Sequence, residues 1–315
     1  MKTSVIVVSW NAKAFLLKCI DSLQRQSLPE SPEIIVVDNA SADGSAQAVK
    51  DSYPRVKLIV NDGNYGFAKA NNIGIRVSAG DYLFLVNSDV VVSDRCFAKC
   101  IQHMESHPEI GMLGPRIVGT DGKVQRSCMS YPTLWNTLCR AFALDSLFPR
   151  SKLFGSQLLT YWNHDDTRAV EVVNGCFWLL RRSALDQVGL LDERFFIYGE
   201  DIDWCKRFNE NGWKVVFFAE AEALHYGGAS SANAPLRFNL EMQRANIQYW
   251  TKHHSRLEST AFLAISVLHH ALRTLGEMAA YPLRRDRSVS EFKIRRSIAS
   301  IKEIIRLDKT LEGAK

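Results

Sequence analysis

Four loops in the first 90 residues are rich in asparagine, aspartate and serine, and each follows an apolar segment. In chain order they are Ser9-Trp-Asn11, Asp38-Asn-Ala-Ser-Ala-Asp-Gly44, Asn61-Asp-Gly-Asn-Tyr-Gly66 and Asn87-Ser-Asp89. Side chains of these types bind hydroxyl groups, the edges of nucleobases and hard divalent cations. Any single loop could equally be an ordinary turn, because the same residue types favour turns. Four such loops in succession favour a binding site.

The segments before these loops predict that all four lie at one edge of a parallel sheet. Apolar, β-branched runs predict strands at 4–9, 33–37, 56–60 and 82–86, with helices between them at 15–24, 45–52 and 67–78. Continuous apolar strands separated by helices are typical of a parallel sheet that is covered on both faces. Ligands of such sheets bind beyond the carboxyl ends of the strands. We therefore expect an α/β fold with a site along this edge.

The rest of the chain is expected to be irregular at first and helical later. Residues 111–165 contain several proline and glycine breaks, and we expect loops near the site there. Later patterns predict strands at 169–180 and 213–218, and helices at 183–188, 202–211, 235–253, 260–280 and 289–311.

Composition and charge exclude several classes of protein. A hydrophobic content of 46% in 315 residues is ample for a packed core. The seven cysteines are odd in number and form no CxxC pair, which argues against a disulfide framework or zinc ribbon and for a reducing compartment. The net charge of +5 comes from residues 281–315, with 10 basic and 5 acidic residues, because residues 1–280 carry 29 of each. A nucleic-acid-binding body is therefore not expected.

Motifs of several other enzyme classes are missing from the sequence. There is no GxxxxGK[ST] or GxGxxG phosphate loop, no HExxH zinc motif and no GxSxG nucleophile elbow. The apolar stretch of the N-terminal segment MKTSVIVVSWNAKAF is too short for a signal peptide, so we expect it to form the first strand. No uncharged apolar run reaches the roughly 18 residues of a membrane-spanning helix. These observations predict a cytoplasmic location.

Six segments of the chain match, in order and spacing, those of a known family. They are VIVVSWN at 5–11, IIVVDNASADGS at 34–45, NYGFAKANNIGI at 64–75, GDYLFLVNSD at 80–89, GLLDERFFIYGEDIDWCKRFNENGWKV at 189–215 and HYGGAS at 225–230. Over roughly residues 3–253, the chain resembles the inverting family 2 glycosyltransferases of the GT-A fold. Within that family it looks most like bacterial rhamnosyltransferases of cell-wall and surface-polysaccharide assembly. The resemblance implies a Rossmann-like, mixed and mostly parallel sheet flanked by helices, with a C-terminal helical extension.

The resemblance also implies a donor site at the ends of the first three strands. The family's counterpart of Asp38 accepts the N3–H of a uracil or thymine ring, a role open to a carboxylate at a strand end; a turn or helix cap is the alternative. The other positions matched to the donor site are Ser9, Asn11, Asn39, Asn64, Gly66, Asn71 and Asn72. The first three would line the nucleoside pocket, and the others belong to a loop and helix. The two helical asparagines could equally form an exposed face.

Asn87, Ser88 and Asp89 match the position of the family's DxD motif, whose carboxylates hold Mg²⁺ or Mn²⁺ against a diphosphate. Asn87 replaces the first carboxylate and is at best a neutral ligand, so Asp89 is the expected metal ligand. His225 matches a position that supplies a further ligand, with a structural hydrogen bond as the alternative. Hard divalent cations prefer oxygen ligands and complete their shell with substrate phosphates.

Glu200 and Asp201 are adjacent acids in the segment YGEDIDW. The resemblance assigns the catalytic base to Asp201, and an inverting transfer needs a base that removes the acceptor's hydroxyl proton. The alternative for both acids is a helix N-cap. Asp203 is expected to be structural. Trp178 and Tyr198 are expected to stack on the acceptor sugar, with core packing as the alternative.

Residues 256–315 are expected to form a helical extension to a glycosyltransferase domain at 1–255. An apolar helix at 260–280 is followed by basic residues at 284–287 and by a helix with isoleucines on one face and cations elsewhere. A basic amphipathic helix beside an apolar one is typical of attachment to a membrane surface. The alternative is a helical hairpin that packs on the domain or in a homodimer.

The function expected from these features is transfer of L-rhamnose from dTDP-L-rhamnose to a saccharide acceptor linked to polyprenyl diphosphate. The process would be cell-wall, O-antigen or exopolysaccharide synthesis, at the inner face of the cytoplasmic membrane. One alternative is a family 2 transferase that uses another UDP- or dTDP-sugar. A nucleotidyltransferase is disfavoured by the first loop, Ser-Trp-Asn-Ala. A non-catalytic sugar-nucleotide-binding or membrane-tethered scaffold protein is the alternative from another class.

Overall fold

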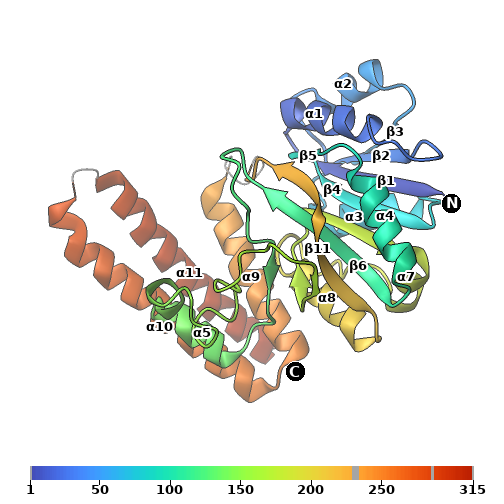
Figure 1. Cartoon of the computed structure of the whole chain (residues 1–315). Helices are drawn as coiled ribbons and strands as arrows, with labels where there is room; N and C mark the ends of the chain where they lie inside the picture. Colours follow the sequence, from blue (N-terminus) through green and yellow to red (C-terminus); the bar gives the residue numbers. More distant parts are fainter. Residues whose placement is uncertain (1, 229–233, 285–286, 314–315) are drawn as a thin grey trace. The chain divides into compact units, whose positions relative to one another are not determined.

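The computed structural model describes residues 2–228, 234–284 and 287–313, which divide into two compact units (Figure 1). The sheet unit comprises residues 1–131, 162–196 and 200–233, and the helical unit comprises residues 132–161, 197–199 and 234–315. The last two residues of the HYGGAS segment and residues 285–286 of the basic run lie outside the described residues.

The sheet unit is built on a mixed sheet whose described strands run in the order β3-β2-β1-β4-β10-β6-β11-β5, with β8 paired to β11. The strands of this sheet are β1 (Thr3–Ser9), β2 (Glu33–Asp38), β3 (Lys57–Val60), β4 (Tyr82–Asn87), β5 (Val90–Val92), β6 (Ile110–Val118), β8 (Arg168–Ala169), β10 (Phe177–Arg181) and β11 (Lys214–His225). The first four are mutually parallel, β6 and β11 are parallel, and β10 runs antiparallel to both of its neighbours. The predicted α/β fold with a mixed sheet is confirmed.

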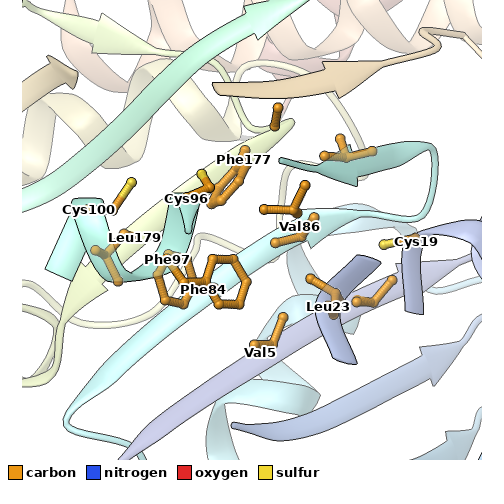
Figure 2. Close-up of a cluster of buried hydrophobic side chains, with 14 of the residues drawn as sticks. Val5, Cys19, Leu23, Phe84, Val86, Cys96, Phe97, Cys100, Phe177 and Leu179 are labelled. Carbon is orange, nitrogen blue, oxygen red and sulfur yellow. The ribbon is translucent and has the colours of Figure 1, made fainter. Parts of the chain in front are cut away.

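Helices cover both faces of the parallel strands, as the continuous apolar runs predicted (Figure 1). They are α1 (Lys13–Gln24), α2 (Ser45–Ser52), α3 (Gly66–Arg76), α4 (Cys96–Ser106), α7 (Arg182–Val188) and α8 (Glu200–Glu210). On one face, Phe84 of β4 stacks on Phe97 of α4 at 3.7 Å between ring centroids, and the edge of Phe177 meets Phe84 (Figure 2). On the other face, α3 lies so close to β1 that a Cβ at Gly74 would be 2.5 Å from Ile6.

For the middle of the chain, one prediction was incomplete and one was wrong. The region expected to form loops contains the central strand β6, and its Gly114 is needed where Val173 approaches, since a Cβ there would lie 3.2 Å from that side chain. The single strand expected at 169–180 is broken into β8, β9 (Val172–Val173) and β10. β9 pairs instead with β7 (Cys128–Met129), because the chain turns at Asn174, whose N–H donates to Ser127.

The helical unit contains α5 (Leu134–Ala141), α6 (Leu144–Leu147), α9 (Pro235–His253), α10 (Arg256–Ala280), a 3₁₀ turn at Tyr281–Leu283, and α11 (Arg287–Gly313). Its division from the sheet unit differs from the expected boundary at residue 255, because α9 packs on the later helices. The ring of Trp250 stacks on Phe262 of α10 at 4.8 Å, and Arg244 forms an ion pair with Glu303 of α11 at 2.7 Å.

Within the described residues, no helix combines the length and apolar character needed to cross a bilayer. All seven cysteines are buried as free thiols, consistent with the absence of a disulfide framework predicted from their odd number.

Candidate functional site

The register of the parallel strands gathers the polar loops at one edge of the sheet. Ser9 at the end of β1 pairs with Asp38 at the end of β2, and Val8 pairs with Asn87 at the end of β4. Each strand therefore stops at nearly the same level. The segments that follow, which contain most of the candidate binding residues, must leave the sheet side by side.

Asp38 and Ser9 each present a buried oxygen that has no hydrogen-bond partner among the described residues. The Asp38 carboxylate is 1% exposed, and its Oδ2 accepts the backbone N–H of Ser41 at 2.9 Å. Its Oδ1 and the Ser9 Oγ are both unpartnered. A buried polar atom left unpaired is costly, and such atoms in native sites usually receive a ligand or water. The expected turn therefore uses one carboxylate oxygen of Asp38 and leaves the other for a donor group.

The asparagines around this pair tie the loops to one another. Asn11 accepts the backbone N–H of Ala42 at 2.8 Å, which joins the first loop to the second. Asn39 donates to the Gly66 carbonyl at 3.1 Å and accepts from Asn61 at 2.8 Å, which joins the second loop to the third. The structure thus gives Asn11 and Asn39 a role in holding these loops together.

Gly66 is a point of close approach between the donor-site loop and the segment that precedes α8. Its φ is +81°, and a Cβ there would lie 2.3 Å from the backbone oxygen of Phe196. The same oxygen accepts the N–H of Phe67 at 2.6 Å, and Asn64 Oδ1 accepts the N–H of Gly66 at 3.0 Å. Only glycine meets both the positive φ and the contact.

Asn71 and Asn72 are buried, so the alternative of an exposed helix face is wrong. Asn71 donates to the Phe67 carbonyl within its own helix at 2.9 Å. Asn72 donates to the Leu191 carbonyl at 2.9 Å and accepts the N–H of Leu191 at 3.1 Å, and it also donates to Glu193. Asn72 therefore fixes α3 to the segment that leads towards α8.

Asp89 and His225 meet because β5 pairs with the end of β11. Val90, the residue after Asp89, is the partner of His225 in that ladder, and the N–H of Tyr226 donates to the Asp89 carbonyl at 3.0 Å. As a result, His225 Nε2 lies 3.3 Å from Asp89 Oδ1. Asn87 and Ser88 precede Asp89; Asn87 is half-buried, and its backbone N–H donates to Cys176.

Gln125, which the sequence analysis did not identify, sets the tautomer of His225. Its amide nitrogen donates to the His225 backbone carbonyl at 2.9 Å, and its Oε1 lies 3.0 Å from His225 Nδ1. Because an amide oxygen only accepts, Nδ1 must carry the proton. In neutral His225, the Nε2 lone pair then faces the Asp89 carboxylate.

Two acceptors facing each other at 3.3 Å call for a positive charge between or beside them. A divalent cation fits this donor set, since a second polar group commonly orients a metal-binding histidine through its other ring nitrogen. The described residues contain no cluster of three or more His, Cys, Asp or Glu side chains that could hold a metal. Asp89 and His225 would supply two ligands, and substrate phosphates would complete the shell.

The two adjacent acids begin α8 in different environments. Glu200 is 5% exposed, and its Oε2 has no partner among the described residues. Burial and then the charge of Asp201 raise the pKa of Glu200 well above its usual range. Asp201 is half-buried, and its Oδ1 accepts the N–H of Ile202. Asp203 has a structural role, as predicted, because it is buried in an ion pair with Arg207 at 3.0 Å.

Cys176 is a buried thiol whose backbone carbonyl accepts the N–H of Asn87 at 3.0 Å. Burial raises the pKa of this thiol, and the charges of Asp89 and Asp201 raise it further. Cys176 therefore stays an uncharged thiol.

The two aromatic candidates lie in different places. Trp178 has no exposed surface; its indole N–H donates to the Val173 carbonyl at 3.0 Å, and its ring packs on the edge of Trp204. It therefore cannot present a face to a sugar, and core packing is its role. Tyr198 belongs to the helical unit, where its ring meets Phe238 at 6.5 Å between centroids, and its contact with an acceptor stays a prediction.

Comparison with known proteins finds similarity to glycosyltransferases. Residues 4–189 match the model of Glycosyl transferase family 2. The chain is 30% identical over 243 residues to N-acetylglucosaminyl-diphospho-decaprenol L-rhamnosyltransferase of Mycobacterium tuberculosis, covering 73% of this chain and 78% of that protein. It is 26% identical to O-antigen biosynthesis protein RfbC of Myxococcus xanthus, over 73% of this chain and 18% of the other.

Solved structures share the fold at low identity. The mannosyltransferase PcManGT from Pyrobaculum calidifontis, in complex with GDP-Man and Mn²⁺, aligns with a TM-score of 0.56 and 16% identity, over 96% of this chain and 87% of that one. S. aureus TarS 1–349 aligns with a TM-score of 0.53 and 14% identity, over 100% of this chain and 92% of the other. At these identities the likeness concerns the fold.

Proposed function

Because the chain belongs to glycosyl transferase family 2 and is a glycosyltransferase, we propose that it transfers L-rhamnose from dTDP-L-rhamnose to a lipid-linked saccharide with inversion at the anomeric carbon. The observations that carry the proposed mechanism concern two carboxylates: Asp89, whose Oδ1 lies 3.3 Å from His225 Nε2, and Asp201, which is half-buried in the first turn of α8. One carboxylate is suited to the leaving diphosphate and the other to the attacking hydroxyl.

The nucleoside half of the donor is proposed to bind at Asp38 and Ser9. The unpartnered Oδ1 of Asp38 would accept the N3–H of thymine or uracil, and the Ser9 hydroxyl would bond to the same ligand. Cytosine has no N3–H, and the N1–H of guanine belongs to a larger ring system, so this pair favours a uracil or thymine nucleotide. Asn11 and Asn39 preserve the pocket by holding its loops together.

The diphosphate is proposed to bind beside Asp89 and His225. These residues would hold Mg²⁺ or Mn²⁺, which when bound would offset the negative charge that builds on the departing diphosphate. Gln125 keeps the Nε2 lone pair of His225 directed to that position. Asn87 would add at most a neutral oxygen, so the protein itself places one carboxylate at this position.

Asp201 is proposed as the base. It would take the proton of the acceptor hydroxyl while that oxygen bonds to the anomeric carbon and the bond to the diphosphate breaks. Glu200 stays protonated beside it because burial and the charge of Asp201 raise its pKa. A protonated Glu200 leaves Asp201 as the group of this pair that is proposed to take the proton.

The donor and acceptor are proposed from the mycobacterial relative, whose name describes rhamnose transfer to N-acetylglucosaminyl-diphospho-decaprenol. The test is incubation of the purified chain with Mn²⁺, a synthetic polyprenyl-diphospho-N-acetylglucosamine and, in separate reactions, dTDP-L-rhamnose and several UDP-sugars. Mass spectrometry would detect the product, and NMR would give its anomeric configuration.

The proposal expects consumption of dTDP-L-rhamnose and a product with inverted configuration. If only a UDP-sugar were turned over, the proposed donor would be wrong, but the proposed mechanism would still stand. Retention of configuration would contradict the mechanism. Nucleotide binding without turnover of any sugar nucleotide would identify a scaffold protein instead.

A further inference from the structure

We propose that the apolar face of α10 and the adjoining segment 134–153 dock on the surface of an anionic phospholipid bilayer. This surface belongs to the helical unit, whereas Asp38, Asp89 and Asp201 belong to the sheet unit. The proposal goes beyond the proposed function, and its evidence does not depend on which sugar is transferred.

One face of α10 is apolar, and most of its residues are exposed to solvent. Residues at three- and four-residue spacing share an arc of the helix surface. In α10 the members of this arc are Leu257, Ala261, Ala264, Ile265, Leu268, Ala271, Leu272, Leu275 and Ala279, all without a polar side-chain group. Among them Leu257 is 81% exposed and Leu275 is 63% exposed. We call this set the α10 face.

The opposite side of α10 already supplies the packing that the fold needs. Phe262, Ser266 and His270 are buried there, and α10 contacts α5, α9 and α11. A helix at the surface of a globular protein normally turns charged and polar residues to water on its outer side. The α10 face has none, so an apolar partner is required to cover it.

The segment next to α10 adds exposed aromatic and aliphatic side chains. His269 of α10 bonds to the backbone carbonyl of Ala141 at the end of α5 at 3.4 Å, and Figure 1 shows α5 beside α10. The exposed large side chains of this segment are Trp135, Phe142, Leu147, Phe148 and Leu153. Trp and Phe together with leucines are the residues that anchor interfacial segments in the headgroup region.

The charge of the helical unit fits an anionic surface. This unit carries 18 lysines and arginines against nine aspartates and glutamates, a net charge of +9, whereas the sheet unit carries 21 against 25, a net charge of −4. Some acids of the helical unit are also neutralised locally: Glu277 pairs with Lys293 at 2.9 Å, and Glu303 pairs with Arg244 and Arg306. Cations near an anionic bilayer strengthen binding in a salt-dependent way. A second copy would bring +9 against +9, which disfavours a dimer through this face.

Vesicle flotation of the full chain tests the proposal. The probes are vesicles of mixed phosphatidylglycerol and phosphatidylcholine, and vesicles of phosphatidylcholine alone. The chain is expected to float with the anionic vesicles, to do so less as salt is raised, and to stay in solution with the neutral ones. Leu275→Glu is expected to lower the partition coefficient by about tenfold, since it removes an apolar contact and adds a repelled charge.

The matched control is Val77→Glu, the same kind of change at a residue of the sheet unit that is 38% exposed. It is expected to bind as the unaltered chain does, and both variants should hydrolyse donor in solution at the unaltered rate, which separates this test from a failure of the proposed function. Absence of flotation with anionic vesicles, or an equal loss in the control, would overturn the proposal. So would a dimer in size-exclusion chromatography that Leu275→Glu dissociates, because a second copy would then cover the face.

Discussion

At the scale of residues, the proposed metal position depends on a side chain that bonds to neither substrate nor cation. Gln125 touches both the backbone carbonyl and Nδ1 of His225, so the imidazole ring has one orientation and one tautomer. Without this constraint, neutral His225 could place its proton on Nε2 and donate to Asp89, which lies 3.3 Å away. His225 and Asp89 would then be hydrogen-bonded to each other, and this bond would compete with a cation.

Gln125→Ala is therefore expected to lower the affinity for Mn²⁺ by about 10- to 100-fold, which is the range for residues that orient a metal ligand. Titration of Mn²⁺ in the presence of nucleotide, by calorimetry and by activity, measures this. Gln125→Glu keeps an acceptor for Nδ1–H and should retain most of the affinity. Gln102→Ala, at an exposed position of α4, is the control. An unchanged metal affinity in Gln125→Ala would show that the tautomer is set in another way.

Glu200 gives a second prediction, on the pH dependence of stability. Its pKa in the folded chain is raised, so between the unfolded value near 4.5 and the folded value the native state holds a proton that the unfolded state has lost. Stability contributed by this group therefore falls as pH rises, by up to about 1.4 kcal/mol per pH unit. Glu200→Gln removes this loss and should stabilise the chain more at pH 8 than at pH 5, as measured by urea unfolding.

Glu210→Gln, at the exposed end of the same helix, should show no such pH-dependent gain. A gain for Glu200→Gln that is equal at both pH values would mean that Glu200 is ionised in the native state.

The residues of the site differ in how far the sequence could reveal them. Asp38 ends a buried strand, Asp89 lies two residues after another, and Asp201 lies in a motif, so local pattern and resemblance point to all three. Gln125 follows a turn of ordinary composition, and its partner lies 100 residues further along the chain. No local signal marks such a contact. Trp178 was misassigned because β10 lies between β4 and β6 and is buried on both faces, which requires the pairing of that strand to be known.

At the scale of elements, the loop proposed to bind the donor and the segment before the proposed base are coupled by the close contact of Gly66 with Phe196. Gly66 begins α3, and the Phe196 carbonyl that it faces lies a few residues before α8 begins at Glu200. Asn72 strengthens the same coupling through its two bonds to Leu191. Nucleotide binding by the loop and positioning of Asp201 should therefore respond to the same substitutions.

Gly66→Ala tests this coupling. The new Cβ would meet the Phe196 oxygen at 2.3 Å in addition to straining a positive φ, so unfolding free energy should fall by about 3 kcal/mol or more, with weaker nucleotide binding. Gly212→Ala is the control, because Gly212 has a φ of +82° but open space around it, and it should cost about 1 kcal/mol. Urea unfolding and nucleotide titration measure both effects. Equal costs for the two variants would contradict a close contact at Phe196.

The strands and helices that could be predicted are those whose own sequence shows an unbroken pattern of apolar residues. The parallel strands and the helices between them have long apolar runs, and their predicted ranges differ from the observed bounds by a few residues. β6 could not be predicted, because its glycine and proline are accommodated by neighbours that only the fold brings close. The same reason applies to β7 and β9, which pair with each other across the 42 residues that separate Met129 from its partner Val172.

At the scale of the whole molecule, the chain separates its charges between the two units. Counting along the sequence placed the whole excess in residues 281–315, whereas the fold assigns +9 to the helical unit and −4 to the sheet unit. The difference arises because residues 132–161 and α9 pack with the C-terminal helices, which no local pattern reveals. By this division, the residues of the proposed transfer belong to the acidic sheet unit, and the proposed membrane surface belongs to the basic helical unit.

The central claim is that Asp201 is the base of an inverting sugar transfer, and the turnover rate of Asp201→Asn tests it most directly. The substitution keeps the shape of the side chain and removes its ability to take a proton, so kcat should fall by about 100-fold or more, while nucleotide affinity and the melting temperature stay unchanged. Glu210→Gln on the same helix should keep the normal rate. Near-normal turnover by a folded Asp201→Asn chain would contradict the account.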